Sequence, residues 1–155
     1  MKAKIKVKLF NPACKIEINP NGDWIDLKSS TNRECPAGKF VSVPLGVCME
    51  LPAGYEAIVA SRSSIYQKTF MYNPNAIGVI DNCYCGDDDE WKWLVYCCRD
   101  VEIEEGQRLC QFRIQLSQHA TMWQKIKWLF TSGVEIEYVD KLTGPNRGGF
   151  GTSGK

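Results

Sequence analysis

The chain has 155 residues, with 19 basic side chains, 18 acidic side chains and a formal net charge of +1. This length predicts one domain, large enough to bury a core. The balanced charge argues against binding to duplex DNA or to a membrane surface, because both need a concentrated basic face. No apolar run approaches transmembrane length, and Met1–Phe10 alternates like a strand and not like a signal peptide, so we expect a cytoplasmic protein.

Short strand-like runs follow one another along the chain, separated by turn residues such as Pro20-Asn21-Gly22 and Pro52-Ala53-Gly54. This rhythm predicts an all-β fold, a sandwich or a jelly-roll-like barrel, in a single domain over residues 1–155. The predicted strands are Lys4–Phe10, Trp24–Leu27, Phe40–Pro44, Val47–Leu51, Tyr55–Ser61, Gly78–Ile80, Trp91–Cys98, Arg108–Gln115 and Val134–Val139.

One segment, near residues 117–131, breaks this rhythm and predicts a short inserted helix. Ser117 is a candidate for its N-terminal cap and Gly133 for its C-terminal cap. An apolar stripe at helical spacing most often faces a core, so we expect it to pack on the barrel or on a neighbouring subunit. A docking surface for a partner protein is the alternative. The stripe consists of Met122, Trp123, Ile126, Leu129 and Phe130.

Eight cysteines in a chain of this length raise the question of a metal site or disulfides. Cys83-x-Cys85 and the adjacent Cys97-Cys98 lack the C-x₂-C spacing of zinc sites, and the single histidine, His119, has no obvious partner. Without a secretion signal, the thiols should stay reduced. We therefore expect them to be small buried hydrophobic residues.

The acidic run Asp87-Asp88-Asp89-Glu90 is a second tempting cluster. Four like charges in sequence repel one another, so the run predicts a solvent-facing loop, with metal binding as the alternative. After it, Trp91 and Trp93 alternate with Lys92, which predicts one buried aromatic face on the following strand.

The segment from Asn75 to Tyr84 has the strongest chemical character. Asp81 follows the strand-like run Gly78-Val79-Ile80, which would hold its carboxylate at the end of a rigid element. Four further segments accompany it in a fixed order: Gly22-Asp23-Trp24-Ile25-Asp26-Leu27, Ser61-Arg62-Ser63-Ser64, Gly106-Gln107-Arg108-Leu109-Cys110-Gln111 and the tail from Arg147 to Gly154.

Taken in order, these five segments resemble the five motifs of the homotrimeric dUTPases, most closely the small branch of Gram-positive bacteria and their phages. The resemblance spans nearly the whole chain, from Ile5 to the C-terminus. It implies hydrolysis of dUTP to dUMP and pyrophosphate, which keeps uracil out of DNA and supplies dUMP for thymidylate synthesis. The chain departs from the family at Cys83 and Cys85, where an acidic and a basic residue are common.

The resemblance also implies how the charges of the reaction are handled. Asp81 matches the catalytic aspartate, which orients and activates the attacking water. Phosphate binding falls to Arg62, Ser63, Ser64 and Gln111. Mg²⁺ is expected on the triphosphate, holding mostly waters, and Asp26 matches the aspartate that reaches the ion through a water, although Asp23 is close enough to compete.

The same resemblance implies how uracil and the sugar are selected. Uracil would lie against a hairpin formed by Asn75–Tyr84, where the Asn75 amide and backbone groups, including those of Gly78 and Ile80, imitate a pairing base. Tyr84 matches the ring under the deoxyribose, where a 2′-hydroxyl would clash.

The tail is the last part of the implied site. The Gly-rich segment 145–155 is expected to be a flexible lid that folds over the bound nucleotide. Phe150 would stack on uracil, and Arg147, Thr152 and Ser153 would reach the β and γ phosphates. Gly151 would also contact the nucleotide. The family more often has Ser-Thr where this chain has Thr152-Ser153.

Two alternatives remain open from the sequence. A dCTP deaminase shares this fold and an Arg-Ser-Ser segment, but its catalytic glutamate is expected near Val95, where Trp93–Cys97 carries no acid. A phage-type dUTPase can also have an added regulatory role, in which the inserted helix binds a protein. The homotrimer implied by the family would build each site jointly from several subunits.

Overall fold

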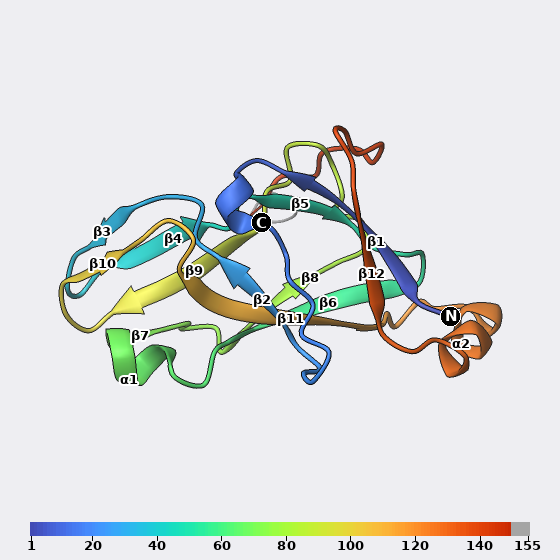
Figure 1. The fold of residues 1–155 in the computed structure, drawn as a ribbon, viewed down its shortest axis with the longest axis horizontal. Helices are drawn as coiled ribbons and strands as arrows, with labels where there is room; N and C mark the ends of the chain where they lie inside the picture. The colour runs from blue at the N-terminus through green and yellow to red at the C-terminus, as the bar shows by residue number, and fades with distance from the viewer. Residues whose placement is uncertain (150–155) are drawn as a thin grey trace.

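A computed structural model describes residues 1–149 of the chain (Figure 1). Its strands form four hydrogen-bonded sheets, with the orders β12-β1-β5, β10-β3, β2-β11-β6-β8 and β4-β9-β7. The strands are β1 (Ala3–Leu9), β2 (Ile25–Lys28), β3 (Arg33–Cys35), β4 (Phe40–Pro44), β5 (Val47–Glu50), β6 (Tyr55–Ser61), β7 (Met71–Tyr72), β8 (Ile77–Ile80), β9 (Lys92–Cys97), β10 (Val101–Ile103), β11 (Arg108–Leu116) and β12 (Val134–Tyr138). The prediction of an all-β, jelly-roll-like fold is confirmed.

One hydrophobic core joins the sheets, because strands from all of them point alternate side chains inward. Trp91 and Trp93 are almost fully buried while Lys92 between them is exposed, so the predicted aromatic face is confirmed. The Trp91 ring meets Phe112 of β11 edge-on, with centroids 5.4 Å apart, which ties two sheets together.

The predicted strands all exist, with ends that differ by one residue at most. Five short elements were not predicted: the strands β3, β7 and β10, the helix α1 (Ile65–Thr69) and the 3₁₀ turn η1 (Pro12–Cys14). Elements of two to five residues hold few apolar positions, so no periodicity can be recognised in them.

The inserted helix, α2, covers Met122–Leu129 and is shorter than predicted. Its N-cap is Thr121 and not Ser117, because the Thr121 and Gln124 side chains form a reciprocal capping box with the backbone. Ser117 belongs instead to a preceding turn, in which its carbonyl accepts from Ala120 N at 3.0 Å. The C-cap is Phe130 and not Gly133.

The apolar stripe of α2 does not pack on the barrel of its own chain, so that expectation is wrong for the single chain. Trp123 is 80% exposed and Leu129 is 77% exposed. The opposite face is docked: Trp128 packs on the core, its ring 5.4 Å from that of Tyr55, and Gln124 lies against Gly54. Figure 1 shows α2 at one end of the molecule, beside the N-terminus.

The cysteines follow the prediction only in part. All eight are free thiols, and Cys14, Cys35, Cys48, Cys97 and Cys110 are buried, but Cys83 and Cys98 are exposed and Cys85 is half-buried. Burial raises the pKa of Cys14 to about 11 and that of Cys48 to about 12. These thiols are therefore protonated at neutral pH, in the form that packs but does not bind metals. Within residues 1–149, no helix is long and apolar enough to span a membrane.

Candidate active site

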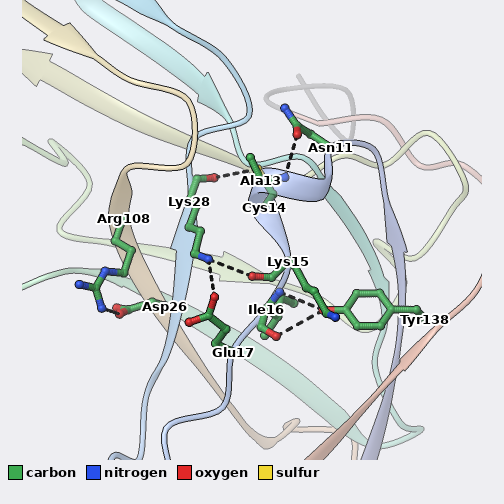
Figure 2. Close-up of polar contacts among 10 residues, drawn as sticks. All are labelled: Asn11, Ala13, Cys14, Lys15, Ile16, Glu17, Asp26, Lys28, Arg108 and Tyr138. Atoms are coloured by element: carbon green, nitrogen blue, oxygen red, sulfur yellow. Dashed lines mark hydrogen bonds and ion pairs between the residues drawn. The ribbon is translucent and has the colours of Figure 1, made fainter.

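The first part of the site lies where β2 and β11 pair. Gln111 of β11 stands opposite Asp26 of β2, and Arg108 projects from the start of β11. Asp26 Oδ2 lies 3.3 Å from Arg108 Nη1 (Figure 2), and Asp26 Oδ1 lies 2.9 Å from Arg62 Nε. These four residues, Asp26, Arg62, Arg108 and Gln111, are called the arginine half-site below. One carboxylate fixes two guanidinium groups, which leaves net positive charge for an anion.

The predicted serines continue this half-site along the chain. Ser63 and Ser64 form the turn between β6 and α1, directly after Arg62. The Ser64 side chain makes no capping bond to α1, so its hydroxyl can donate to a ligand. The Gln111 amide donates to the Ser61 carbonyl at 3.3 Å, which holds it beside the same turn. Arg62, Ser63, Ser64 and Gln111 are therefore neighbours, as the sequence predicted.

The donors around Asp26 decide whether the site fits Mg²⁺. Among residues 1–149, no group of three or more His, Cys, Asp or Glu side chains is arranged to hold a metal ion. Asp26 is a lone carboxylate whose two oxygens both contact arginines. Such a site fits an ion that arrives with a triphosphate and keeps most of its waters, and it does not fit an all-protein cage.

The second part of the site is the turn after β8. A hydrogen bond of 3.0 Å from Tyr84 N to Asp81 O closes this turn. The Asn82 side chain donates to the Pro52 carbonyl at 2.9 Å and to the Tyr55 carbonyl at 3.0 Å, which fastens the turn to the loop before β6. Asp81 is exposed at its tip. Sequence analysis missed Asn82, whose only signal was its place next to Asp81.

The predicted hairpin of Asn75–Tyr84 is wrong in its pairing. β8 pairs with β6 through Gly78↔Val59 and Ile80↔Ala57, while the preceding strand β7 pairs with β9. β8 is therefore an edge strand of the four-stranded sheet. An edge strand presents a row of backbone donors and acceptors, which is what recognition of a base edge by backbone groups requires. Asn75 lies exposed in the turn that leads into this edge.

Tyr84 lies at the base of the same turn. Its hydroxyl donates to the Glu90 carbonyl at 3.0 Å, and its ring packs partly on the core. Burial raises the pKa of Tyr84 to about 12, so the phenol stays neutral at physiological pH. A half-buried neutral ring with a fixed hydroxyl is a flat platform, as the resemblance implies for the sugar.

The described start of the tail reaches this part of the site. Arg147 Nη1 lies 2.7 Å from Asp81 Oδ2, and the hydrogen bond with Asp81 raises the pKa of Arg147. Gly149 passes the Tyr84 hydroxyl so closely that an added Cβ would lie 3.3 Å from it. Asp81, Tyr84 and Arg147 are called the aspartate half-site below. Phe150, Gly151, Thr152 and Ser153 lie outside the described residues.

The acidic run is not a solvated loop, so that prediction is wrong. Asp87 pairs with Lys8 at 2.6 Å, Asp88 accepts from the Asn146 amide at 2.7 Å, and Glu90 accepts from Gly46 N at 3.0 Å. Asp89 is 1% exposed and accepts from three backbone N–H groups. The charges are tolerated because each carboxylate has its own donors, which the sequence could not show.

The two half-sites lie at opposite ends of β6. The pair Ile80↔Ala57 places Asp81 level with Glu56 near the start of the strand, whereas Arg62 directly follows its last residue, Ser61. Six residues of extended strand separate these positions by about 20 Å. One chain therefore does not bring Asp81 and Arg62 together.

A cleft of about 580 Å³ lies beside Asp81. The turn at Asp81–Cys83 forms one side, and residues 117–119 with Thr121 form the other. The segment that leads into α2 thus borders Asp81, a neighbourhood that its position in the sequence did not suggest.

Known proteins resemble this chain in sequence and in fold. The family model for dUTPase matches residues 24–127. The prophage SPβ deoxyuridine 5′-triphosphate nucleotidohydrolase of Bacillus subtilis is 40% identical over 152 residues, which cover 97% of this chain and 98% of that protein. The enzyme of the same name from Escherichia phage T5 is 32% identical, over 97% of this chain and 98% of that protein.

This chain belongs to the dUTPase family.

Solved structures support the fold. The dUTPase of Streptococcus mutans superposes with a TM-score of 0.69 at 22% identity, over 75% of this chain and 98% of that one. The dUTPase of the Staphylococcus bacteriophage 80α superposes with a TM-score of 0.60 at 22% identity, over 76% of this chain and 93% of that one. Family membership disfavours the deaminase alternative, and Val95 is a core residue that is 1% exposed.

Asn82 provides a test of the geometry around Asp81. Replacing Asn82 with Ala removes the donor from backbone carbonyls of residues 51–55, which should cost about 1–3 kcal/mol of folding free energy and misplace Asp81. Asn82→Asp should be worse, because a carboxylate can only repel those carbonyl oxygens. Thermal unfolding and turnover of both variants check this order, and equal effects of Ala and Asp would contradict it.

Proposed function

We propose that this protein hydrolyses dUTP to dUMP and pyrophosphate, by attack of a water held by Asp81 on the α-phosphate. Family membership supports the reaction, and the exposed Asp81 carboxylate, fixed beside a free strand edge and a tyrosine platform, supports the residue assignment. The reaction would keep uracil out of DNA and supply dUMP for thymidylate synthesis. The reaction would take place in the cytoplasm, where deoxynucleotides are made.

Asp81 acts mainly by orienting the water. An aspartate is a weak base, so most of its benefit comes from holding the oxygen in line with phosphorus while it accepts the proton. In the structure, Arg147 occupies the Asp81 carboxylate at 2.7 Å. Binding of a triphosphate gives Arg147 a more highly charged partner and frees the carboxylate for water.

Different parts of the site bind the phosphates, the uracil and the deoxyribose of the nucleotide. The arginine half-site, with Ser63 and Ser64, binds the phosphate chain through charge and hydroxyl donors. Backbone groups at Gly78 and Ile80, together with Asn75, bind the uracil edge, and Tyr84 supports the deoxyribose. The tail over residues 145–155 closes as a lid, which places Phe150 on the base and Gly151, Thr152 and Ser153 at the outer phosphates.

Mg²⁺ is proposed as the cofactor. A D-to-N variant of the phage φ11 dUTPase of Staphylococcus aureus, which superposes with a TM-score of 0.66 at 18% identity, coordinates a structural Mg(II) ion. In this chain, Asp26 would hold a water of an ion bound to the triphosphate. The ion would neutralise phosphate charge. Asp26 at the same time keeps Arg62 and Arg108 in place.

Asp81→Asn tests the catalytic assignment. The amide keeps the shape of the side chain but cannot accept the proton, so kcat should fall by about 10² or more while dUTP still binds. Pyrophosphate release with Mg²⁺, measured for dUTP and for each of the other deoxynucleoside triphosphates, gives both the activity and its selectivity. Near-normal turnover of the variant would show that another group activates the water.

We also propose a homotrimer in which neighbouring subunits complete each site. The support is the separation of Asp81 from Arg62 along β6 within one chain, together with membership in a family whose resemblance implied trimers. A three-fold ring of identical contacts can place the arginine half-site of one subunit against the aspartate half-site of the next.

Subunit mixing tests this arrangement. Asp81→Asn and Arg62→Ala should each be inactive alone, and their exchange in equal amounts should recover about a quarter of wild-type activity, since that fraction of sites in random rings has both intact residues. Mixed species are confirmed by mass, and mixing Asp81→Asn with itself is the control. Absence of recovery in confirmed mixed trimers would mean that both residues serve one site within a subunit.

A regulatory protein partner is a second, added role, for which the exposed stripe of α2 is the specific observation. Phage dUTPases, including that of bacteriophage 80α, control transfer of virulence genes by a proto-oncogenic G protein-like mechanism. In this chain, the segment before α2 borders the Asp81 cleft, so a protein bound on α2 would sit next to the nucleotide.

The two faces of α2 give matched variants. Ile126→Asp together with Leu129→Asp should leave the melting temperature, the oligomeric mass and the turnover unchanged, because the stripe is largely exposed. Trp128→Ala on the docked face should lower stability by about 2 kcal/mol, as expected for a partly buried ring. A double variant that unfolds or loses its trimer would show that a neighbouring subunit covers the stripe, which contradicts the partner proposal.

A further inference from the structure

The carboxylate of Asp89 is buried and is held by backbone N–H groups. Its Oδ1 accepts from Arg147 N at 3.0 Å and from Gly148 N at 2.9 Å. Its Oδ2 accepts from Gly86 N and from Arg147 N, both at 2.9 Å. The residue is 1% exposed. The two oxygens therefore hold the backbone of the first two residues of the tail motif.

This arrangement keeps Asp89 ionised. Desolvation opposes the charge, but the N–H groups of Arg147, Gly148 and Gly86 outweigh it, so the pKa of Asp89 lies below its ordinary value. Hydrogen bonds from backbone donors to a carboxylate are roughly twice as strong as neutral ones. A buried anion with this many fixed donors is a rigid anchor.

The backbone around Asp89 is closely packed. Gly86 and Gly144 form an isolated parallel bridge, and a Cβ added at Gly86 would lie 2.5 Å from Asn146 Cα. The neighbouring acid, Asp88, exchanges hydrogen bonds with Asn146: Asp88 N donates to the Asn146 amide oxygen at 2.9 Å, and the amide donates back at 2.7 Å. Asp88 and Asp89 together thus bind residues 146–148 by hydrogen bonds.

We propose that Asp89 is a positioning residue that clamps the backbone of Arg147 and Gly148 and thereby aims the Arg147 guanidinium at Asp81. The inference rests on the proposed hydrolysis for its effect on turnover. Asp89 touches neither the nucleotide nor the water; it acts through the main chain of Arg147, whose side chain reaches the Asp81 carboxylate at 2.7 Å.

An amide cannot replace this carboxylate. The contacts of Asp89 use both oxygens, and Asn has only one, so its NH₂ group would face an N–H donor. Asp88→Asn is the matched control, because it removes one negative charge from the same loop but keeps an oxygen that can accept the Asn146 bond. Comparison of the two variants separates the acceptor geometry from the charge.

The first readout is turnover. Asp89→Asn should lower kcat for dUTP by about tenfold or more, since small errors in placing a reacting group are costly, while Asp88→Asn should resemble the unaltered chain. In a chain that ends at Asn146, the Asp89 substitution should cause no additional loss. An equal further loss in the shortened chain would show a general structural role and would overturn the proposal.

The second readout does not depend on activity. Trypsin cleaves after Arg147, and the clamp holds the backbone on both sides of that bond. Loss of residues 148–155, followed by the mass of the intact chain, should be faster in Asp89→Asn than in the unaltered chain and in Asp88→Asn. Cleavage at the same rate in all three would overturn the clamp. If the unaltered chain released no pyrophosphate from dUTP, the proposed function would fail while this readout still judged the clamp.

Gly86→Ala perturbs the same clamp without touching the buried charge. Its Cβ would displace Asn146, so it should also speed loss of residues 148–155 and lower kcat. This variant carries the test if Asp89→Asn does not fold. If neither variant folds, the carboxylate is required for the fold itself and the positioning role is wrong.

Discussion

The antiparallel pairing of β6 with β8 and β11 sets the geometry on which the active site depends. β11 brings Gln111 and Arg108 to the end of β6 that leads into Arg62, and β8 carries Asp81 to the other end. The strand is rigid and about 20 Å long, so its length fixes the separation of the two half-sites. Within one chain the two half-sites stay apart, which is the geometric basis of the proposed trimer.

Charge is managed around the site by carboxylates with complete sets of donors. Asp26 faces two guanidinium groups, Asp87 faces Lys8, and Asp89 faces backbone N–H groups. A buried or half-buried carboxylate without such donors would cost several kcal/mol. With them, it becomes a fixed point that holds a neighbouring group in place, as Asp89 holds the backbone of Arg147 and Gly148.

The inserted helix shows a different constraint. Its capping box and the docking of Trp128 on Tyr55 hold it firmly, although its apolar stripe gains nothing from the core of its own chain. A patch of that kind favours aggregation unless something covers it. The helix also starts from the segment that borders the Asp81 cleft, so anything bound there lies close to Asp81.

The sequence alone determined the all-β fold, the positions of the longer strands, the family and the order of its motifs. These features depend on local alternation, on turn residues and on short runs that carry their chemistry within a few positions. Only the tertiary structure decided that β8 is an edge strand and not a hairpin arm, that the stripe of α2 faces outward, and that Asp89 is buried under the tail. Each of these depends on partners far away in the chain, such as Val59, Tyr55 and Arg147, and local periodicity contains no information about which distant backbone donors a side chain will meet.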